Sequence, residues 1–180
     1  MKKIALLLLL PLATVTGLFA QVFNTSSTLN FGQFSAGIEP ALYINGGNDF
    51  NLFLHAGAGI TSDIDFGVKL GIMGDNVYIG GDIEFSLNRY FSVAGGAHVY
   101  GDFGLDATGL VTLPIGSAAD IYSGLDLDVD FTDSGPRVPL WIPLGIEIPI
   151  RKYILFYFET EIRLTNYGNH IIGAGVSFLF

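Results

Sequence analysis

An alternation with a period of two residues runs through this chain from about residue 33 to its end. Between short clusters of turn residues, an aliphatic or aromatic side chain stands at every second position. In 138–148, for example, every even-numbered residue is Val, Leu or Ile. Successive side chains of a β-strand point to opposite faces, so the pattern predicts strands that each have one apolar face. Apolar residues do not recur here with the 3.6-residue period of an amphipathic helix, and the sequence therefore predicts an all-β fold.

The alternating region breaks into ten segments, each of a length that suits one strand. We expect these strands at 33–44, 50–61, 64–73, 77–87, 90–100, 103–115, 119–131, 138–150, 153–164 and 169–180. The residues between them are rich in Gly, Asn, Asp and Ser, which are typical of tight turns. Hairpins joined in series form an antiparallel meander of ten strands, or of eight if two shorter segments merge or lie outside the sheet.

The two faces of these strands differ in charge. The apolar phase, roughly 60 positions in all, contains no Asp, Glu, Lys or Arg. The opposite phase carries 12 of the 17 acidic residues but only two basic ones, Lys69 and Arg163. We expect an acidic wall formed by Glu39, Asp82, Glu84, Asp106, Asp126, Asp128, Asp130, Glu147, Glu159 and Glu161, with Asp65 and Asp120 in the same phase. Such crowding must be relieved by counter-ions, by carboxylates that stay protonated, or by both.

Two architectures alternate in this way. A soluble barrel or sandwich hides its apolar face, whereas a membrane barrel turns that face to lipid and keeps a polar interior. Hydrophobic residues make up 50% of the chain and charged residues 14%, against roughly 25% charged in an ordinary soluble domain. A closed sheet also pairs every strand edge, as lipid requires. The sequence therefore favours a closed antiparallel up-and-down transmembrane β-barrel, with a soluble barrel as the alternative.

The first residues have the three parts of an export signal. Lys2 and Lys3 form a positive region, residues 4–13 are almost purely apolar, and small residues lead to Ala20. The apolar run is shorter than a spanning helix needs and is followed by the breaker Gly17, which argues against a helical anchor. We expect a signal peptide at 1–20 and a single barrel domain at 21–180.

The composition also bears on chemistry. The chain has no Cys, which removes disulfides and thiolate ligands, and 17 acidic against 8 basic residues argue against a nucleic-acid partner. Asp126, Asp128 and Asp130 lie roughly 7 Å apart on one face, which suits a cation-attracting mouth, a metal site of oxygen ligands or a solvated wall. No calcium-loop spacing follows them, and no Ser lies in a nucleophile elbow. We expect no catalytic residue, no metal and no cofactor.

Two further features of the interior phase leave alternatives open. Pro139, Pro143 and Pro149 all remove N–H donors toward the same neighbouring strand, which either weakens that seam or costs little because only Pro143 is central. The same phase holds many Gly residues facing large aromatic residues such as Phe53 and Tyr122. The glycines either leave a narrow water path or give the rings room to fill the interior.

The last residues, Ile172-Gly173-Ala174-Gly175-Val176-Ser177-Phe178-Leu179-Phe180, carry a resemblance. A terminal Phe with apolar residues at alternate positions before it resembles the last strand of bacterial outer-membrane β-barrels, of the small OmpA/OmpX/OmpW-like type. The resemblance implies an outer-membrane location, contact with lipid, and recognition of Phe178 and Phe180 by the barrel-assembly machinery. It also implies that the connections at 45–49, 132–137 and 165–169 face outside. The chain departs from that type in its very short connections and in placing Tyr and Trp in the interior phase.

These features predict a function for the barrel. Because rings of carboxylates select cations, the acidic interior favours a narrow, passive, cation-preferring channel for ions or small cationic or neutral solutes. The alternative is a non-conducting structural or surface-interaction barrel whose polar interior is plugged. Short connections argue against a large protein-binding surface and against the enzymes known among such barrels, so we expect no enzyme.

Overall fold

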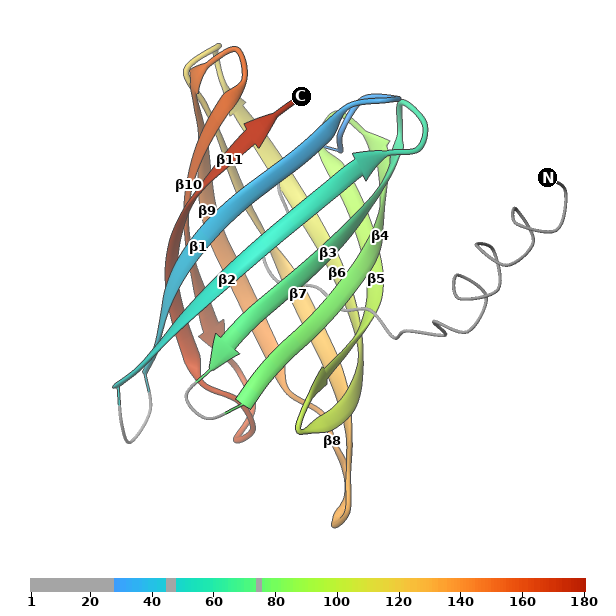
Figure 1. Ribbon diagram of the computed structural model, residues 1–180, viewed down its shortest axis with the longest axis vertical. Helices are drawn as coiled ribbons and strands as arrows, with labels where there is room; N and C mark the ends of the chain where they lie inside the picture. Colours follow the sequence, from blue (N-terminus) through green and yellow to red (C-terminus); the bar gives the residue numbers. More distant parts are fainter. Residues whose placement is uncertain (1–27, 45–47, 74–75) are drawn as a thin grey trace, which may run out of the picture.

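A computed structural model describes residues 28–44, 48–73 and 76–180, so the predicted signal peptide at 1–20 lies outside the described residues. Strands form nearly all of the described chain (Figure 1). They are β1 (Phe34–Ile44), β2 (Asn48–Gly59), β3 (Ile64–Met73), β4 (Asn76–Asn88), β5 (Phe91–Tyr100), β6 (Asp102–Ile115), β7 (Ala119–Thr132), β8 (Gly135–Arg137), β9 (Leu140–Arg151), β10 (Ile154–Arg163) and β11 (His170–Leu179). Within the described ranges, no helix is long and apolar enough to cross a membrane.

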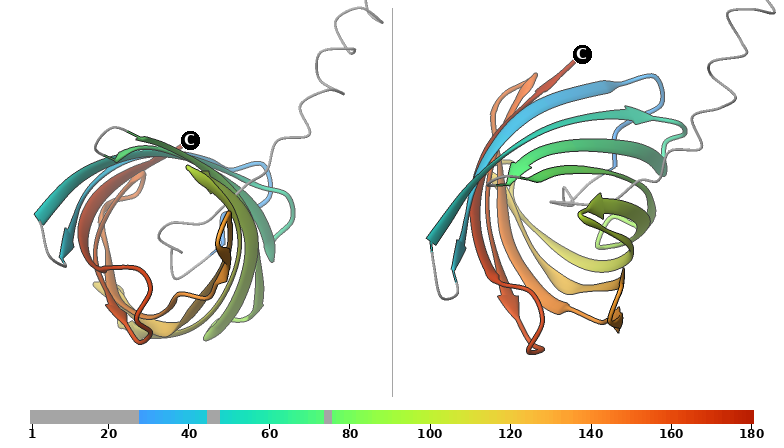
Figure 2. Two further views of the ribbon diagram at one scale, coloured as in Figure 1. Left: turned by 90° about the horizontal axis from the view of Figure 1, so that it is seen from below. Right: turned by 60° about the horizontal axis from the view of Figure 1, so that its bottom comes forward.

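The strands close into one antiparallel barrel, visible as a ring in Figure 2. From β1 to β8 and from β9 to β11, each strand pairs with its neighbour in sequence, β9 pairs with β7, and β1 pairs with β11 to close the sheet. The short β8 and the longer β9 both pair with β7 in a single register, since Asp130 faces Arg137 and Leu127 faces Leu140. They therefore occupy a single strand position in the barrel. The prediction of a closed ten-stranded barrel is confirmed, and the eight-stranded alternative is wrong.

The predicted strand boundaries agree with the structure to within two residues, apart from the start of the eighth strand. Pairing there begins at Gly135, where Thr132 faces Gly135 across a two-residue connection. Gly135 has a φ of 113°, a left-handed value that glycine adopts without steric cost, so the paired strand begins three residues earlier than the sequence pattern indicated. The strand is then interrupted at Val138 and Pro139, between β8 and β9.

Burial alternates along the strands in the sense expected for a membrane barrel. On β1, Glu39 and Ala41 are buried in the interior, whereas Ile38 and Leu42 are 43% and 44% exposed on the outside. Large apolar side chains cover the outer face of every long strand. The apolar phase is thus the outer face of the barrel, and the soluble alternative, in which that phase would be hidden, is wrong.

The two ends of the barrel differ in what they carry (Figure 1). Phe180 lies at one end, together with the connections β2–β3, β4–β5, β6–β7 and β9–β10, and we call this the C-terminal end. The opposite end carries the β7–β8 hairpin and the turn of residues 164–169 between β10 and β11, and we call it the hairpin end. A site in the interior is therefore reached from one of two distinct mouths.

Candidate functional site

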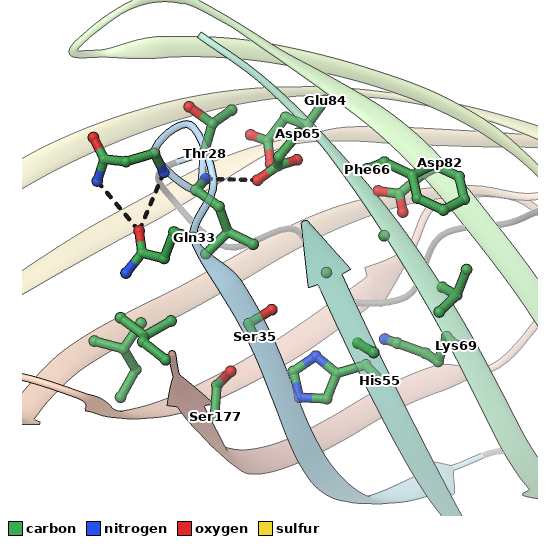
Figure 3. Close-up of a pocket in the computed structure, with 18 of the residues that line it drawn as sticks. Thr28, Gln33, Ser35, His55, Asp65, Phe66, Lys69, Asp82, Glu84 and Ser177 are labelled. Carbon is green, nitrogen blue, oxygen red and sulfur yellow. Dashed lines mark hydrogen bonds between the residues drawn. The ribbon is translucent and has the colours of Figure 1, made fainter. Parts of the chain in front are cut away.

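The described residues line two cavities in the interior of the barrel, one toward each end. The cavity at the C-terminal end, of about 230 Å³, is lined by Ser35, His55, Asp65, Lys69, Asp82, Glu84 and Glu147, among others (Figure 3). The cavity at the hairpin end, of about 450 Å³, is lined by acidic and aromatic residues that include Tyr43, Asp126, Asp128, Asp130, Trp141 and Glu161. None of the described residues lines both cavities. The two spaces are therefore separated by other side chains.

A layer of buried side chains lies between the cavities. On β1, Ser35 lines the C-terminal cavity and Tyr43 the hairpin-end cavity, and Glu39 stands halfway between them. On β10, Leu155 lines the C-terminal cavity and Glu161 the hairpin-end cavity, and Tyr157 and Glu159 lie between them. We call the layer formed by Glu39, Phe53, Tyr122, Tyr157 and Glu159 the central layer. Each of its members has an exposed fraction of 2% or less.

Glycines on neighbouring strands make room for the rings of this layer. A Cβ atom at Gly145 would overlap the ring of Tyr122, and one at Gly71 would overlap the ring of Phe53. Each of these glycines is the cross-strand partner of the aromatic residue, so the ring occupies the space that a Cβ atom would fill. The sequence left open whether the interior glycines provide a water path or space for rings, and in the central layer they provide space for rings.

Polar contacts fix the central layer as well. Lys69 Nζ lies 3.3 Å from Glu39 Oε2, and both side chains are almost fully buried. The same ammonium group lies 5.5 Å from the centre of the Phe53 ring, within the range of a cation–π interaction. The Tyr157 hydroxyl and His55 Nε2 are 2.6 Å apart, which joins the layer to the wall of the C-terminal cavity. The layer is therefore held by charge as well as by packing.

The predicted acidic wall is distributed over three levels of the interior. Asp82, Glu84 and Glu147 line the C-terminal cavity, as does the predicted base Lys69. Glu39 and Glu159 belong to the central layer. Asp126, Asp128, Asp130 and Glu161 line the hairpin-end cavity. Asp106 is 7% exposed and lies beside His98, which lines the same cavity.

The remaining predicted residues lie elsewhere. Arg163, the second predicted base, donates from Nη1 to the carbonyl oxygen of Gly168, 3.0 Å away in the turn at the hairpin end. Phe178 and Phe180 are 45% and 73% exposed on the outer surface near the C-terminal end. Their recognition by an assembly machinery stays a prediction.

Sequence reasoning did not single out His98 as a member of the acidic site. Its Nε2 atom lies 3.1 Å from Asp130 Oδ1 and its Nδ1 atom 3.5 Å from Asp106 Oδ2. The ring of Tyr78 stacks on it, with 5.7 Å between ring centres and 23° between ring planes. The alternation on the fifth predicted strand puts His98 in the interior phase. Its ring lies over Gly104, its partner on β6, and this contact can be identified only once the register of β5 and β6 is known.

The fold and this interior together define a class of protein. A closed ten-stranded antiparallel barrel with an uncharged apolar outer face and a polar interior is an integral β-barrel of the bacterial outer-membrane type. No protein-family model matches the chain, and no curated protein matches it in sequence.

Comparison with solved structures agrees with that class. The chain is similar to an outer membrane channel from Pseudomonas putida F1, with a TM-score of 0.51 and 7% identity over 89% of this chain and 100% of that one. It is also similar to the outer membrane protein OprG from Pseudomonas aeruginosa, with a TM-score of 0.44 and 11% identity over 87% of this chain and 99% of that one. At such low identity the likeness concerns the fold.

Proposed function

We propose that this outer-membrane barrel does not conduct in its resting state and that its acidic cavity at the hairpin end takes up cations from outside the cell. This is the plugged-interior alternative of the sequence analysis. The observation that carries it is the central layer, whose buried side chains separate two cavities with no lining residue in common. A hydrated ion moving along the axis would have to displace these side chains.

The charge of the hairpin-end cavity supports the cation-binding part of the proposal. Asp126, Asp128, Asp130 and Glu161 line it, and Arg137 stands on the same wall. A narrow space bounded by low-dielectric walls concentrates the field of such charges and raises the local concentration of cations. We adopt the orientation implied by the C-terminal resemblance, in which this mouth faces outside and meets external ions first.

Recording from the purified barrel in planar lipid bilayers tests the closed interior. We expect no discrete conductance steps from the wild-type protein, and steps from Phe53→Gly/Tyr122→Gly, which removes two rings of the central layer. Tyr100→Ala is the matched control, because Tyr100 is an aromatic residue that lines the hairpin-end cavity outside the central layer. This control variant should show no conductance steps. Steady conductance from the wild type would contradict the closed interior.

A cation-preferring channel is the second candidate, and the acidic lining of both cavities favours it. A pore of this kind requires the central layer to rearrange. Conductance, where present, should then prefer cations, and the preference should fade as salt screens the field. Replacing Asp126, Asp128 and Asp130 together by Asn should lower the cation preference, measured as the reversal potential across a salt gradient. Conductance without charge preference would exclude this candidate.

A further inference from the structure

We infer that His98, Asp106 and Asp128 form a binding site for a divalent transition-metal ion, such as Zn²⁺ or Mn²⁺, beside the hairpin-end cavity. Each of the three residues offers one ligand atom, and these atoms all lie within 4.8 Å of one another. The inference rests on the proposed cation-binding role of that cavity and names its ligand. One imidazole nitrogen with two carboxylate oxygens is a donor set that suits such ions.

The distance between His98 and Asp106 matches that between two ligands of one ion. Two atoms bound tetrahedrally to a metal ion at about 2.1 Å lie about 3.4 Å from each other. The His98 Nδ1 and Asp106 Oδ2 atoms are 3.5 Å apart, which is long for a hydrogen bond but close to that ligand separation. The geometry of this pair therefore already resembles that of two ligands around one ion.

A second observation concerns the other nitrogen of His98. Its Nε2 atom lies 3.1 Å from Asp130 Oδ1, on the far side of the ring from Asp106. A histidine that ligates a metal almost always donates its second ring N–H to a carboxylate or carbonyl, which fixes the tautomer and the direction of the ligating nitrogen. Asp130 is placed to do this for His98, and the stacked Tyr78 ring restricts the imidazole further.

The backbone is also shaped around this arrangement. Gly104 faces both His98 on β5 and Asp130 on β7, and a Cβ atom at this position would overlap the imidazole ring. Only a glycine here lets His98 lie across β6 to reach Asp130. The residue pattern therefore brings a ring from one strand to a carboxylate two strands away.

The pairing of the two carboxylates calls for a cation between them. Asp106 and Asp128 are direct partners across β6 and β7, on the same face of the sheet. Like charges at directly opposed positions destabilise an antiparallel pair. Among the described residues, the group nearest to Asp106 that can carry a positive charge is the imidazole of His98, and Asp130 also contacts this ring. A divalent ion held by Asp106 and Asp128 would neutralise the opposed pair.

Isothermal titration of ZnCl₂ into the refolded, tag-free barrel in detergent micelles tests the site. We expect one binding site, with Mg²⁺ and Ca²⁺ binding about 100-fold more weakly because they gain little from an imidazole ligand. His98→Gln and Asp128→Asn should each weaken Zn²⁺ binding by about tenfold or more, and Asp130→Asn by about 10- to 100-fold through loss of the histidine's orientation.

Asp102→Asn is the matched control, because it removes one charge from the same strand as Asp106 and from the lining of the same cavity but lies outside the triad. It should change Zn²⁺ binding by about threefold or less, since only the general field is reduced. Each variant is first checked for the gel mobility of a folded barrel, and the visible absorption of bound Co²⁺ reports on the coordination geometry in the folded variants.

Three outcomes would overturn the inference. They are Zn²⁺ binding that survives His98→Gln, an equal loss in Asp102→Asn and Asp128→Asn, and Mg²⁺ binding as strong as that of Zn²⁺. Titration with choline separates the inference from the function on which it rests. Choline binding without Zn²⁺ binding keeps the cation cavity and refutes the metal site, whereas a failure of both cations to bind refutes both.

Discussion

A charge placed on the outer face at mid-depth gives the most direct test of how the barrel meets lipid. Leu144 is 41% exposed on the outside of β9 and pairs with Thr160 of β10. A strand rises about 3.3 Å per residue and tilts by about 40°, so the roughly 25 Å apolar band of such barrels takes about ten residues of a strand. A band that begins near Leu140 is then centred within about one residue of Leu144.

From this position, Leu144→Arg should lower the free energy of unfolding by about 2–4 kcal/mol, the cost measured for Arg at the middle of the bilayer. Leu87→Arg is the matched control. Leu87 is 63% exposed on the outer face next to the end of β4, at the C-terminal end, where the cost should fall to about 0–1 kcal/mol.

Urea titration of the barrel folded into phospholipid vesicles measures both values, with the gel mobility of unboiled samples reporting the folded fraction. The depth dependence is the critical result. Equal costs at the two positions, or a Leu144→Arg variant as stable as wild type, would refute the membrane placement of this face. Release of the wild-type protein from membranes by carbonate washing would refute it independently.

Changes at three further positions test separate parts of the structure. Deletion of Phe180 should slow assembly in cells while leaving the refolded barrel intact, and an unchanged folded yield would contradict an assembly role. Lys69→Met should cost about 3–5 kcal/mol in urea titrations because Glu39 is left buried without its cation, and Lys69→Met/Glu39→Leu should recover most of this loss. Pro143→Val restores a backbone donor toward β7 and should stabilise the barrel by about 1 kcal/mol, whereas a loss of stability would show that the ring is required for packing.

The sequence predicted the fold best where apolar and polar residues alternate regularly along a strand. Alternation specified which face of each strand is apolar, and a slip by one residue would have turned Glu39 outward and Ile38 inward, so the pattern allowed few registers. The start of the eighth strand was less predictable. Asp133, Ser134 and Gly135 all favour a turn, and the particular reversal depends on the φ of a single glycine.

The candidate site was less accessible to sequence reasoning, for a geometric reason. Asp128 was singled out for its neighbours along β7, but its partners in the site lie across strands, Asp106 on β6 and His98 on β5. Which residues meet across a sheet depends on the register of every hairpin in between. The closure of the central layer raises the same difficulty, because the Tyr122 ring on β7 lies over Gly145, its partner on β9, and that pairing depends on the register of the intervening hairpin.

The pairing between β7 and β9 shows that a closed barrel tolerates local loss of backbone hydrogen bonds at prolines. Pro139 faces β7, where its carbonyl oxygen accepts from Asp128 N at 3.1 Å, but its nitrogen returns no donor. Pairing is interrupted there and again opposite Pro143, yet the pairs on either side keep a single register from Asp120 to Asp130. The remaining pairs fix the alignment, because both strands are also held by their other neighbours, β6 and β10. This continuity supports the interpretation in which the prolines cost little, and it keeps Asp128 aligned with Asp106 at the proposed metal site.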